Sequence, residues 1–292
     1  MPGEHRLDSP PSAKGKISIV IPCFNQGELL LETLASIERF RNNSLNEVII
    51  VNDGSTDVTT CQILCELDAN RYAVLHQPNQ GLGKARNTGI EIARSEFILP
   101  LDSDNLIRGA YLDGGVALLV ENPDLGVVYG DAEYFGERTG RWRVADFDLT
   151  SMVKENFIDA CALYRKSVWE SVGGYDEKMP RMGWEDWDYW MRVALRGWKF
   201  RHLDEIAFDY RVRQNSMIND TNRHACELSA YIFNKPGNEI LKALRSQGEE
   251  IEHRGEEIEQ LLRVRDSWDY RVGRLILSPL RKTKRLLSGL RH

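Results

Sequence analysis

The stretch FILPLDSDN, residues 97–105, decides how the rest of this sequence is interpreted. Its first four residues are mostly apolar and are typical of the end of a buried strand. Asp102 and Asp104 follow, and residues two apart in an extended segment point to the same side. Their carboxylates repel each other unless a cation lies there, and a hard divalent ion such as Mg²⁺ or Mn²⁺ takes oxygen ligands of this kind. A solvated Asp-Ser-Asp-Asn turn is the alternative interpretation.

Length and composition indicate an ordinary globular protein. The 292 residues are enough for one large domain or two modest ones. Hydrophobic residues make up 42% of the sequence and charged residues 28%, as in most globular proteins. The net charge of −6 at pH 7 is opposite in sign to that of typical nucleic-acid-binding domains, so we expect no nucleic-acid partner.

The cysteines and the N-terminal segment indicate a cytoplasmic protein. Five cysteines are an odd and sparse set, which favours reduced thiols. Cys61 and Cys65 lie one helical turn apart but have no companion Cys or His motif, so we expect them to be small helix residues. Residues 1–15 are rich in proline, serine and glycine, lack the apolar core of a signal peptide and are expected to be disordered. The sequence contains no run of about 18 apolar residues.

Short apolar segments alternate with amphipathic segments over residues 17–101. Strands are predicted at 17–21, 47–51, 72–76 and 97–101, and helices at 28–40, about 57–69 and about 84–94. This alternation predicts an α/β fold with a mostly parallel sheet flanked by helices, and Thr56 or Asp57 is expected to cap the second helix. Ligands of such sheets bind outside the carboxyl ends of the strands. Polar loops begin at or near these ends, at Cys23, Asn52, Asn79 and Asp102, and we expect them to converge on one crevice.

Each of these loops also has a simpler interpretation. Asp53-Gly54 is a common turn dipeptide, and Gly81-Leu82-Gly83 lacks the third glycine of a dinucleotide fingerprint. Arg86 alone could be a surface residue of a helix. Together, however, the Asp53 carboxylate, the amides near the glycines, the arginine and a metal at the two aspartates of residues 97–105 favour a nucleotide-diphosphate site.

Four motifs, in this order along the chain, resemble those of the family-two inverting glycosyltransferases, which have the GT-A fold. They are PCFN at 22–25, NDGSTD at 52–57, GLGKARNTG at 81–89 and LDSDN at 101–105. Their spacing also matches the family. The resemblance covers about residues 16–220 and implies a GT-A-like domain that uses a divalent cation, Mn²⁺ or Mg²⁺, and a nucleoside diphosphate sugar.

The resemblance implies roles for individual residues of the donor site. Asp53 would read the base of the nucleotide, and Arg86 would lie near it. Asp102 would contact the ribose and share the metal with Asp104. Of the two carboxylates, Asp104 is the favoured metal ligand. The other residues expected to bind the nucleotide sugar are Pro22, Phe24, Asn25, Gly81, Gly83, Ser103 and Arg213.

The acceptor side is expected in the second half of the domain. Residues 156–165 (NFIDACALYR) resemble the segment before the family's acceptor floor, and residues 173–177 (GGYDE) resemble its turn. The sequence departs from the family at Asp159-Ala160-Cys161, where many members carry small residues including glycine. A strand is also expected at 127–130.

The stretch GWEDWD, residues 183–188, is the candidate catalytic segment. Carboxylates between tryptophans can have a pKa tuned by partial burial, although acidic residues also favour the first turn of any helix. The resemblance makes Asp186 the general base and places Trp184 and Glu185 on the acceptor side. Asp188 is expected on the helix surface.

The segment YRVRQNSM, residues 210–217, resembles the family's loop that closes over the diphosphate. Arginine suits phosphate because its planar fork donates two hydrogen bonds at once. Arg211 and Arg213 alternate along the chain, so one of them is expected to face the site, and we favour Arg213. His202 is either a further metal ligand or a structural histidine, the latter being favoured.

The sequence pattern changes beyond Pro236. Residues 236–292 are expected to form a helical extension that follows the domain at residues 16–235. A seven-residue repeat places Leu244, Ile251 and Ile258 in one register, which fits either a short coiled coil or an amphipathic helix packed on the domain. Residues 263–292 contain nine Lys or Arg and two Asp, interleaved with Trp and Leu. Such a segment can lie on a membrane surface, form an oligomer contact or remain a solvated tail.

We therefore predict an inverting glycosyltransferase. It would transfer a sugar from a nucleoside diphosphate sugar, with UDP favoured, to a hydroxyl of a glycan or lipid-linked glycan during cell-surface polysaccharide or glycolipid synthesis. A sugar-phosphate nucleotidyltransferase and a catalytically inactive scaffold are the alternatives. The former would place a Gly-rich loop with arginine directly after the first strand, where this sequence has PCFN.

Overall fold

The computed structural model describes residues 13–41, 44–70, 72–214, 221–235 and 237–266. The chain divides into two compact units, Met1–Glu239 and Ile240–His292. The division falls close to the predicted boundary at residue 236. Most of the predicted disordered segment and most of the basic tail lie outside the described residues.

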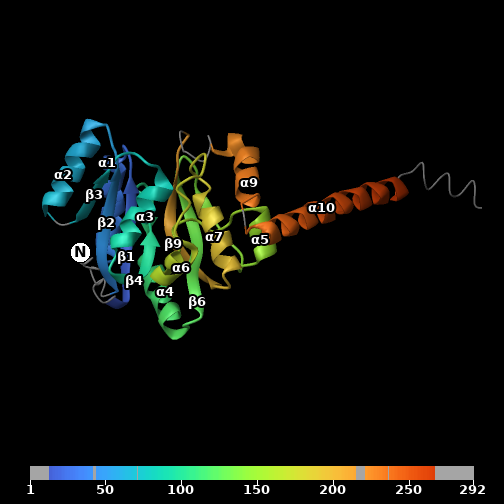
Figure 1. The fold of residues 1–292 in the computed structure, drawn as a ribbon, viewed down its shortest axis with the longest axis horizontal. Helices are drawn as coiled ribbons and strands as arrows, with labels where there is room; N and C mark the ends of the chain where they lie inside the picture. Colours follow the sequence, from blue (N-terminus) through green and yellow to red (C-terminus); the bar gives the residue numbers. More distant parts are fainter. Residues whose placement is uncertain (1–12, 42–43, 71, 215–220, 236, 267–292) are drawn as a thin grey trace, which may run out of the picture. The chain divides into compact units, whose positions relative to one another are not determined.

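The described residues of the first unit form a nine-stranded sheet with helices packed against it (Figure 1). The strands are β1 (Ala13–Cys23), β2 (Leu45–Asp53), β3 (Ala73–Gln77), β4 (Ser95–Pro100), β5 (Leu106–Ile107), β6 (Leu125–Gly136), β7 (Gly140–Trp142), β8 (Leu163–Arg165) and β9 (Lys199–Val212). Their order across the sheet is β3-β2-β1-β4-β8-β6-β9-β5, and β7 pairs with β6. The first strand begins before the predicted residue 17, because Ala13 pairs with Ser95 of β4.

The sheet is parallel in its first half and mixed in its second. β1 pairs in parallel with β2 and β4, and β3 continues this parallel arrangement. β8 is antiparallel to both β4 and β6, so β4 and β6 run in the same direction. β9 is parallel to β6, and β5 is antiparallel to β9. Hence the carboxyl ends of β1, β2, β4, β6 and β9 all lie at one edge of the sheet, where polar side chains can gather.

Ten helices alternate with or follow these strands in the described part of the chain. They are α1 (Gly27–Arg39), α2 (Val58–Asn70), α3 (Leu82–Ile92), α4 (Gly109–Glu121), α5 (Leu149–Lys154), α6 (Lys166–Val172), α7 (Glu185–Leu195), the 3-10 helix η1 (Asn222–His224), α9 (Ala225–Phe233) and α10 (Glu239–Asp266). The predicted cap of α2 is confirmed at Asp57, whose Oδ1 accepts a hydrogen bond from the Thr60 backbone N–H at 2.8 Å.

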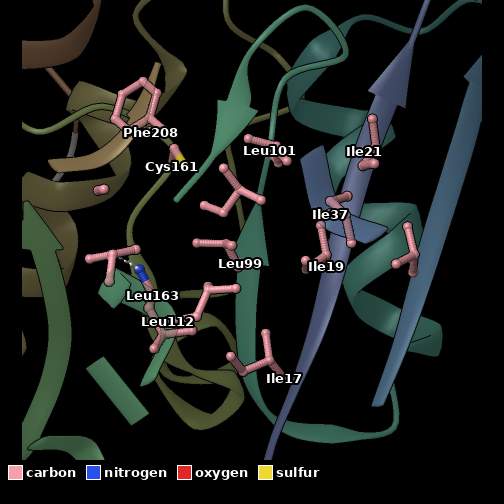
Figure 2. Packing of buried hydrophobic residues seen from close by; sticks show 14 of the residues in the cluster. Ile17, Ile19, Ile21, Ile37, Leu99, Leu101, Leu112, Cys161, Leu163 and Phe208 are labelled. Carbon is pink, nitrogen blue, oxygen red and sulfur yellow. Dashed lines mark hydrogen bonds between the residues drawn. The ribbon is translucent and has the colours of Figure 1, made fainter. Parts of the chain in front are cut away.

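The core lies between the sheet and the helices that cover it. Ile17, Ile19 and Ile21 of β1 are fully buried and join Ile37 of α1 in one apolar cluster (Figure 2). Because alternate residues of a strand point to opposite faces, Val20 faces the other side, where it meets α3. This double coverage explains why β1 is a continuous run of apolar residues rather than an alternating one.

The second unit is represented by α10. Ile251 and Ile258, which share the seven-residue register, are 69% and 56% exposed. Ion pairs between residues four apart, such as Arg254–Glu250, run along the helix. No helix in the described ranges is both long and apolar enough to cross a membrane.

Gly89 allows α3 to approach the sheet closely. A Cβ at this position would lie 2.4 Å from Val20 Cγ1 and 3.0 Å from Val51 Cγ2. We therefore expect Gly89→Ala to lower the free energy of unfolding by about 1–3 kcal/mol through overpacking, measured by urea denaturation. Glu91→Ala, an exposed change on the same helix, should shift it by less than about 0.5 kcal/mol. Equal stability of the two variants would contradict this account of the packing.

Candidate active site

The loops after β1 and β2 are joined at the carboxyl edge of the sheet. Asn25, which has a left-handed φ of 54°, accepts hydrogen bonds through Oδ1 from the backbone N–H groups of Thr56 at 2.7 Å and Asp57 at 3.1 Å. Pro22 lies within β1 and is buried, whereas Phe24 is 45% exposed. Asn25 thus fixes the loop geometry, and Phe24 is the accessible side chain of this motif.

Asp53 organises the Gly-rich loop that enters α3. Its carboxylate is buried and accepts hydrogen bonds from the side chain of Gln77 at 2.7 Å and from the backbone N–H groups of Gln80 and Gly81, both at 2.9 Å. Gly81 has a φ of 89°, a conformation that favours glycine. At Gly83 a Cβ would lie 3.1 Å from the Asp176 carbonyl oxygen, so a larger residue would crowd this turn.

Arg86 is a buried cation between two acidic groups of the site. It is 2% exposed, and its guanidinium donates from Nη1 to Glu185 Oε1 at 2.6 Å and from Nη2 to Asp102 Oδ1 at 2.7 Å. Burial alone would lower the pKa of this guanidinium, but the charges of Asp102 and Glu185 raise it well above its usual range. Arg86 is therefore not a surface residue, and it ties the loop after β4 to the start of α7.

Both candidate arginines of the closing segment contact Asp104, in different ways. Arg213 donates from Nη2 to the Asp104 carboxylate at 2.5 Å. Arg211 donates from Nε to the Asp104 backbone carbonyl at 2.9 Å and from Nη2 to Glu32 at 2.6 Å. Ser103 is buried, and its hydroxyl donates to Gln26 at 2.6 Å. Contacts from Arg211, Arg213 and Gln26 thus fix the turn after β4. Of the two arginines, Arg213 is the one that contacts the Asp104 carboxylate.

Asp102 and Asp104 suit a divalent cation as two hard oxygen ligands. Burial, and after it the charge of Asp102, raises the pKa of Asp104 above its ordinary value, although Arg213 and Arg211 act in the opposite direction. No group of three potential metal-ligating side chains occurs among the described residues. Mg²⁺ is commonly bound by one or two carboxylates with water and substrate phosphates completing the shell, so this pair fits such an ion. His202 has a structural partner instead, since its Nε2 lies 3.0 Å from Asp131.

Asp186 lies in the first turn of α7 next to Glu185. Its Oδ1 accepts a hydrogen bond from the Trp187 backbone N–H at 2.7 Å, and within the described ranges it pairs with no Lys, Arg or His. Burial raises the pKa of Asp186 well above its ordinary value, and the charges of Glu185 and Asp159 add to this effect. The Trp184 ring meets Trp187 edge to face at 5.0 Å. A carboxylate whose pKa is raised in this way accepts a proton more readily than an ordinary aspartate does.

Asp188 is not on the helix surface, and that prediction was wrong. It is 1% exposed and accepts hydrogen bonds from Lys235 at 2.6 Å and from Arg192 Nε at 2.9 Å. Lys235 also pairs with Asp176 at 2.5 Å. Helical periodicity did not reveal this burial, because one of the two cations, Lys235, lies beyond α9 and is distant in sequence.

Two residues near this site were not among the predicted site residues. The Asp159 charge acts on Asp186, and burial followed by the charge of Asp102 raises the pKa of Asp159 to about 7. Burial and then the charge of Asp159 raise the pKa of Tyr210. The sequence did contain one signal for Asp159, because the family that the sequence resembles often has small residues at this position.

The double pairing of Arg86 predicts a large loss of stability when it is removed. Arg86→Met leaves the buried Glu185 and the partly exposed Asp102 without this cation, so we expect the free energy of unfolding to fall by about 3–5 kcal/mol, measured by chemical denaturation. Arg94→Met, which removes the 62% exposed partner of Glu47, should cost no more than about 1 kcal/mol. A loss at position 86 as small as that at 94 would show that the buried pairs contribute little.

Comparison with known proteins shows the family to which this chain belongs. Residues 18–189 match the family model described as glycosyl transferase family 2. EpsH of Bacillus subtilis (strain 168), which is named as a glycosyltransferase, is 31% identical over 212 residues, covering 67% of this chain and 55% of that protein. The glycosyltransferase GlyG of Streptococcus pneumoniae is 34% identical over 129 residues, covering 43% of this chain and 42% of that protein. The chain thus spans about half the length of these curated relatives.

The fold also matches solved structures. Residues 1–349 of TarS from S. aureus, crystallised with UDP-GlcNAc, superpose with a TM-score of 0.61 at 20% identity, covering 80% of this chain and 71% of that one. The same protein with UDP gives a TM-score of 0.60. The predicted GT-A α/β fold is thereby confirmed. Since the family model covers more than half of the chain, this protein belongs to glycosyl transferase family 2.

Proposed function

We propose that this protein transfers a sugar from a nucleoside diphosphate sugar, UDP-linked, to an acceptor hydroxyl with inversion at the anomeric carbon. The observation that carries the proposal is the arrangement around Arg86. Its guanidinium donates hydrogen bonds both to Asp102, in the turn after β4, and to Glu185, which precedes Asp186 in the sequence. A group suited to take a proton and a group suited to hold a leaving diphosphate are thereby kept in one site.

The donor side is formed by the loops after β1, β2, β3 and β4 and by the end of β9. Asp53, the Gly81–Gly83 turn and Phe24 are proposed to hold the nucleotide. Arg213 is proposed to bind the diphosphate, since its guanidinium already lies on the Asp104 carboxylate and can donate to phosphate oxygens. That TarS was crystallised with UDP and UDP-GlcNAc on the same fold supports a uridine nucleotide.

Asp102 and Asp104 are the residues that would hold Mg²⁺ or Mn²⁺. When bound, such an ion supplies positive charge that stabilises the departing diphosphate. Burial and the negative charge of Asp102 disfavour the ionised form of Asp104, so a cation held by this pair would favour that form.

Asp186 is proposed to be the general base. Its carboxylate takes the proton of the acceptor hydroxyl as that oxygen attacks the anomeric carbon and the bond to the diphosphate oxygen breaks. One displacement of this kind inverts the anomeric carbon and leaves a nucleoside diphosphate, a glycoside and a protonated Asp186. A raised pKa suits this role, since a base with an ordinary aspartate pKa of about 3.9 accepts protons weakly at neutral pH.

The acceptor is proposed to be a glycan or lipid-linked glycan in the synthesis of cell-surface polysaccharide or glycolipid. One relative supports this class: a poly-beta-1,6-N-acetyl-D-glucosamine synthase of Staphylococcus epidermidis is 28% identical over 182 residues, 42% of its length.

Donor binding tests the proposed nucleotide site. We expect calorimetry to show binding of UDP in preference to GDP, dTDP and CMP, strengthened by Mn²⁺. Asp104→Ala should lose the Mn²⁺ dependence, because it removes one of the two proposed ligands. Asp124→Ala, at an exposed position, is the matched control and should bind as the wild type does. A folded wild-type protein that binds none of these nucleotides would refute the transferase assignment.

Removal of the proposed base should affect turnover and not donor binding. Asp186→Asn should slow transfer by about 10²–10⁴-fold, measured as UDP release in the presence of acceptor, while the calorimetric affinity for UDP is retained. The substitution keeps the size of the side chain. Unchanged turnover in this variant would exclude Asp186 as the base.

The pH dependence of transfer should report the raised pKa. The ionised form of Asp186 is the active one, so kcat/KM should fall as pH falls through its pKa, and this acid limb should lie above the ordinary aspartate value of about 3.9. Because the charge of Asp159 raises the pKa of Asp186, Asp159→Asn should move the limb to lower pH. A limb near the ordinary value in the wild type would contradict the role of burial.

A further inference from the structure

The segment at 221–235 lies beyond the residues that match the family model, and it contacts the segment that carries Asp186 at both ends. At its start, the buried Thr221 donates from Oγ1 to the Met182 carbonyl at 2.9 Å. At its end, Lys235 Nζ lies 2.6 Å from Asp188 Oδ1. The two contacts flank residues 183–187, so this part of the chain is held before and after the proposed base.

Lys235 lies between two carboxylates that are distant from it in sequence. Its Nζ is 2.5 Å from Asp176 Oδ2 as well as 2.6 Å from Asp188 Oδ1, and its side chain is only 17% exposed. The Tyr231 hydroxyl donates to the same Asp176 oxygen at 3.0 Å. Hydrogen bonds between ionised groups in such a partly buried setting are short and strong, so the position of the ammonium group is well defined.

The two carboxylates belong to different parts of the candidate site. Asp188 is in the first turn of α7, two residues after Asp186. Asp176 is in a turn that packs on the Gly-rich loop, since a Cβ at Gly83 would lie 3.1 Å from the Asp176 carbonyl oxygen. Lys235 therefore ties the start of the helix that carries the proposed base to a turn that contacts the proposed donor loop.

The start of α7 depends on such contacts, because its own cap is weak. Its N-cap residue, Trp184, makes no side-chain hydrogen bond to the free backbone N–H groups of the first turn. The apolar side of α9 adds support, since the Phe233 ring meets Trp187 edge to face at 5.8 Å. The Trp187 backbone N–H in turn donates to Asp186 Oδ1 at 2.7 Å.

We propose that Lys235 is a positioning residue for glycosyl transfer: by joining Asp176 to Asp188, it fixes the start of α7 and the Asp186 carboxylate relative to the donor loop. The inference rests on the proposed function, in which Asp186 is the base. Lys235 acts through α7 and not on the substrate.

The physical reason is the sensitivity of proton transfer to distance. A general base must lie within hydrogen-bond reach of the hydroxyl that it deprotonates, and a displacement of about 1 Å can cost up to 10²-fold in rate. The donor loop has a separate anchor, because the Asp53 carboxylate accepts hydrogen bonds from the backbone N–H groups of Gln80 and Gly81. Loss of Lys235 should therefore affect the base more than the nucleotide.

The test combines transfer kinetics over a range of pH, UDP calorimetry and circular dichroism at the assay temperature, all on the full chain. The test variants are Lys235→Met, which removes the charge and keeps the length of the side chain, and Asp176→Asn, which leaves the Lys235–Asp188 pair. The matched control is Lys199→Met, because Lys199 is 68% exposed and pairs with Asp124 at 3.2 Å on the surface.

We expect Lys235→Met to lower kcat by about tenfold or more while the affinity for UDP is retained. The acid limb of kcat/KM should move to lower pH. Burial is the main cause that raises the pKa of Asp186, and a displaced helix start exposes this carboxylate to water. The other groups that act on Asp186, namely Glu185, Asp159, Arg86 and the Trp187 N–H, are unchanged in this variant. Asp176→Asn should show the same two effects to a smaller extent, and Lys199→Met should behave as the wild type.

Two results would overturn the proposal. One is a folded Lys235→Met protein with the kcat and the acid limb of the wild type. The other is a kcat that falls only in proportion to the folded fraction with an unmoved acid limb, because that result indicates a purely structural role. If Lys235→Met does not fold, Asp176→Asn decides by the same criteria. A wild type that binds no UDP would instead refute the proposed function.

Discussion

The buried ion pairs of Arg86 are the interaction on which the rest of the site depends. Moving a guanidinium out of water costs several kcal/mol, and only well-placed counter-charges offset this cost. Arg86 has two, Asp102 and Glu185, at 2.7 Å and 2.6 Å. One comes from the first half of the domain and the other from the second. The position of either acidic loop is therefore coupled to the position of the other.

A second set of contacts keeps α3, which carries Arg86, against the second half of the domain. Asn87 Oδ1 accepts hydrogen bonds from the Trp169 indole at 2.9 Å and from the Tyr175 backbone N–H at 2.8 Å. Its Nδ2 donates to the Tyr175 carbonyl at 2.9 Å. Lys235 continues this support through Asp176 and Asp188. Polar groups with so many partners define one arrangement, because each alternative would leave buried groups unpaired.

The electrostatics of the site follow from this framework. Carboxylates that have cation partners hold the structure together, as Asp102, Glu185 and Asp188 do. Asp186 and Asp159 have no such partner among the residues described by the structure, and burial raises the pKa of each. The same burial that strengthens the Arg86 pairs thus raises the pKa of two further carboxyl groups, which disfavours their ionised forms.

The sequence by itself determined the strand-and-loop order of the first half, the family, the Asp102–Asp104 pair and the place of Asp186 at the start of a helix. These features are local, since apolar runs, turn residues and motif spacing extend over a few neighbouring residues. Only the tertiary structure decided that Arg86 and Asp188 are buried. These facts depend on contacts such as that between Lys235 and Asp188, residues in different elements. A periodic pattern shows which face of a helix is polar, but it does not show whether a distant cation covers that face.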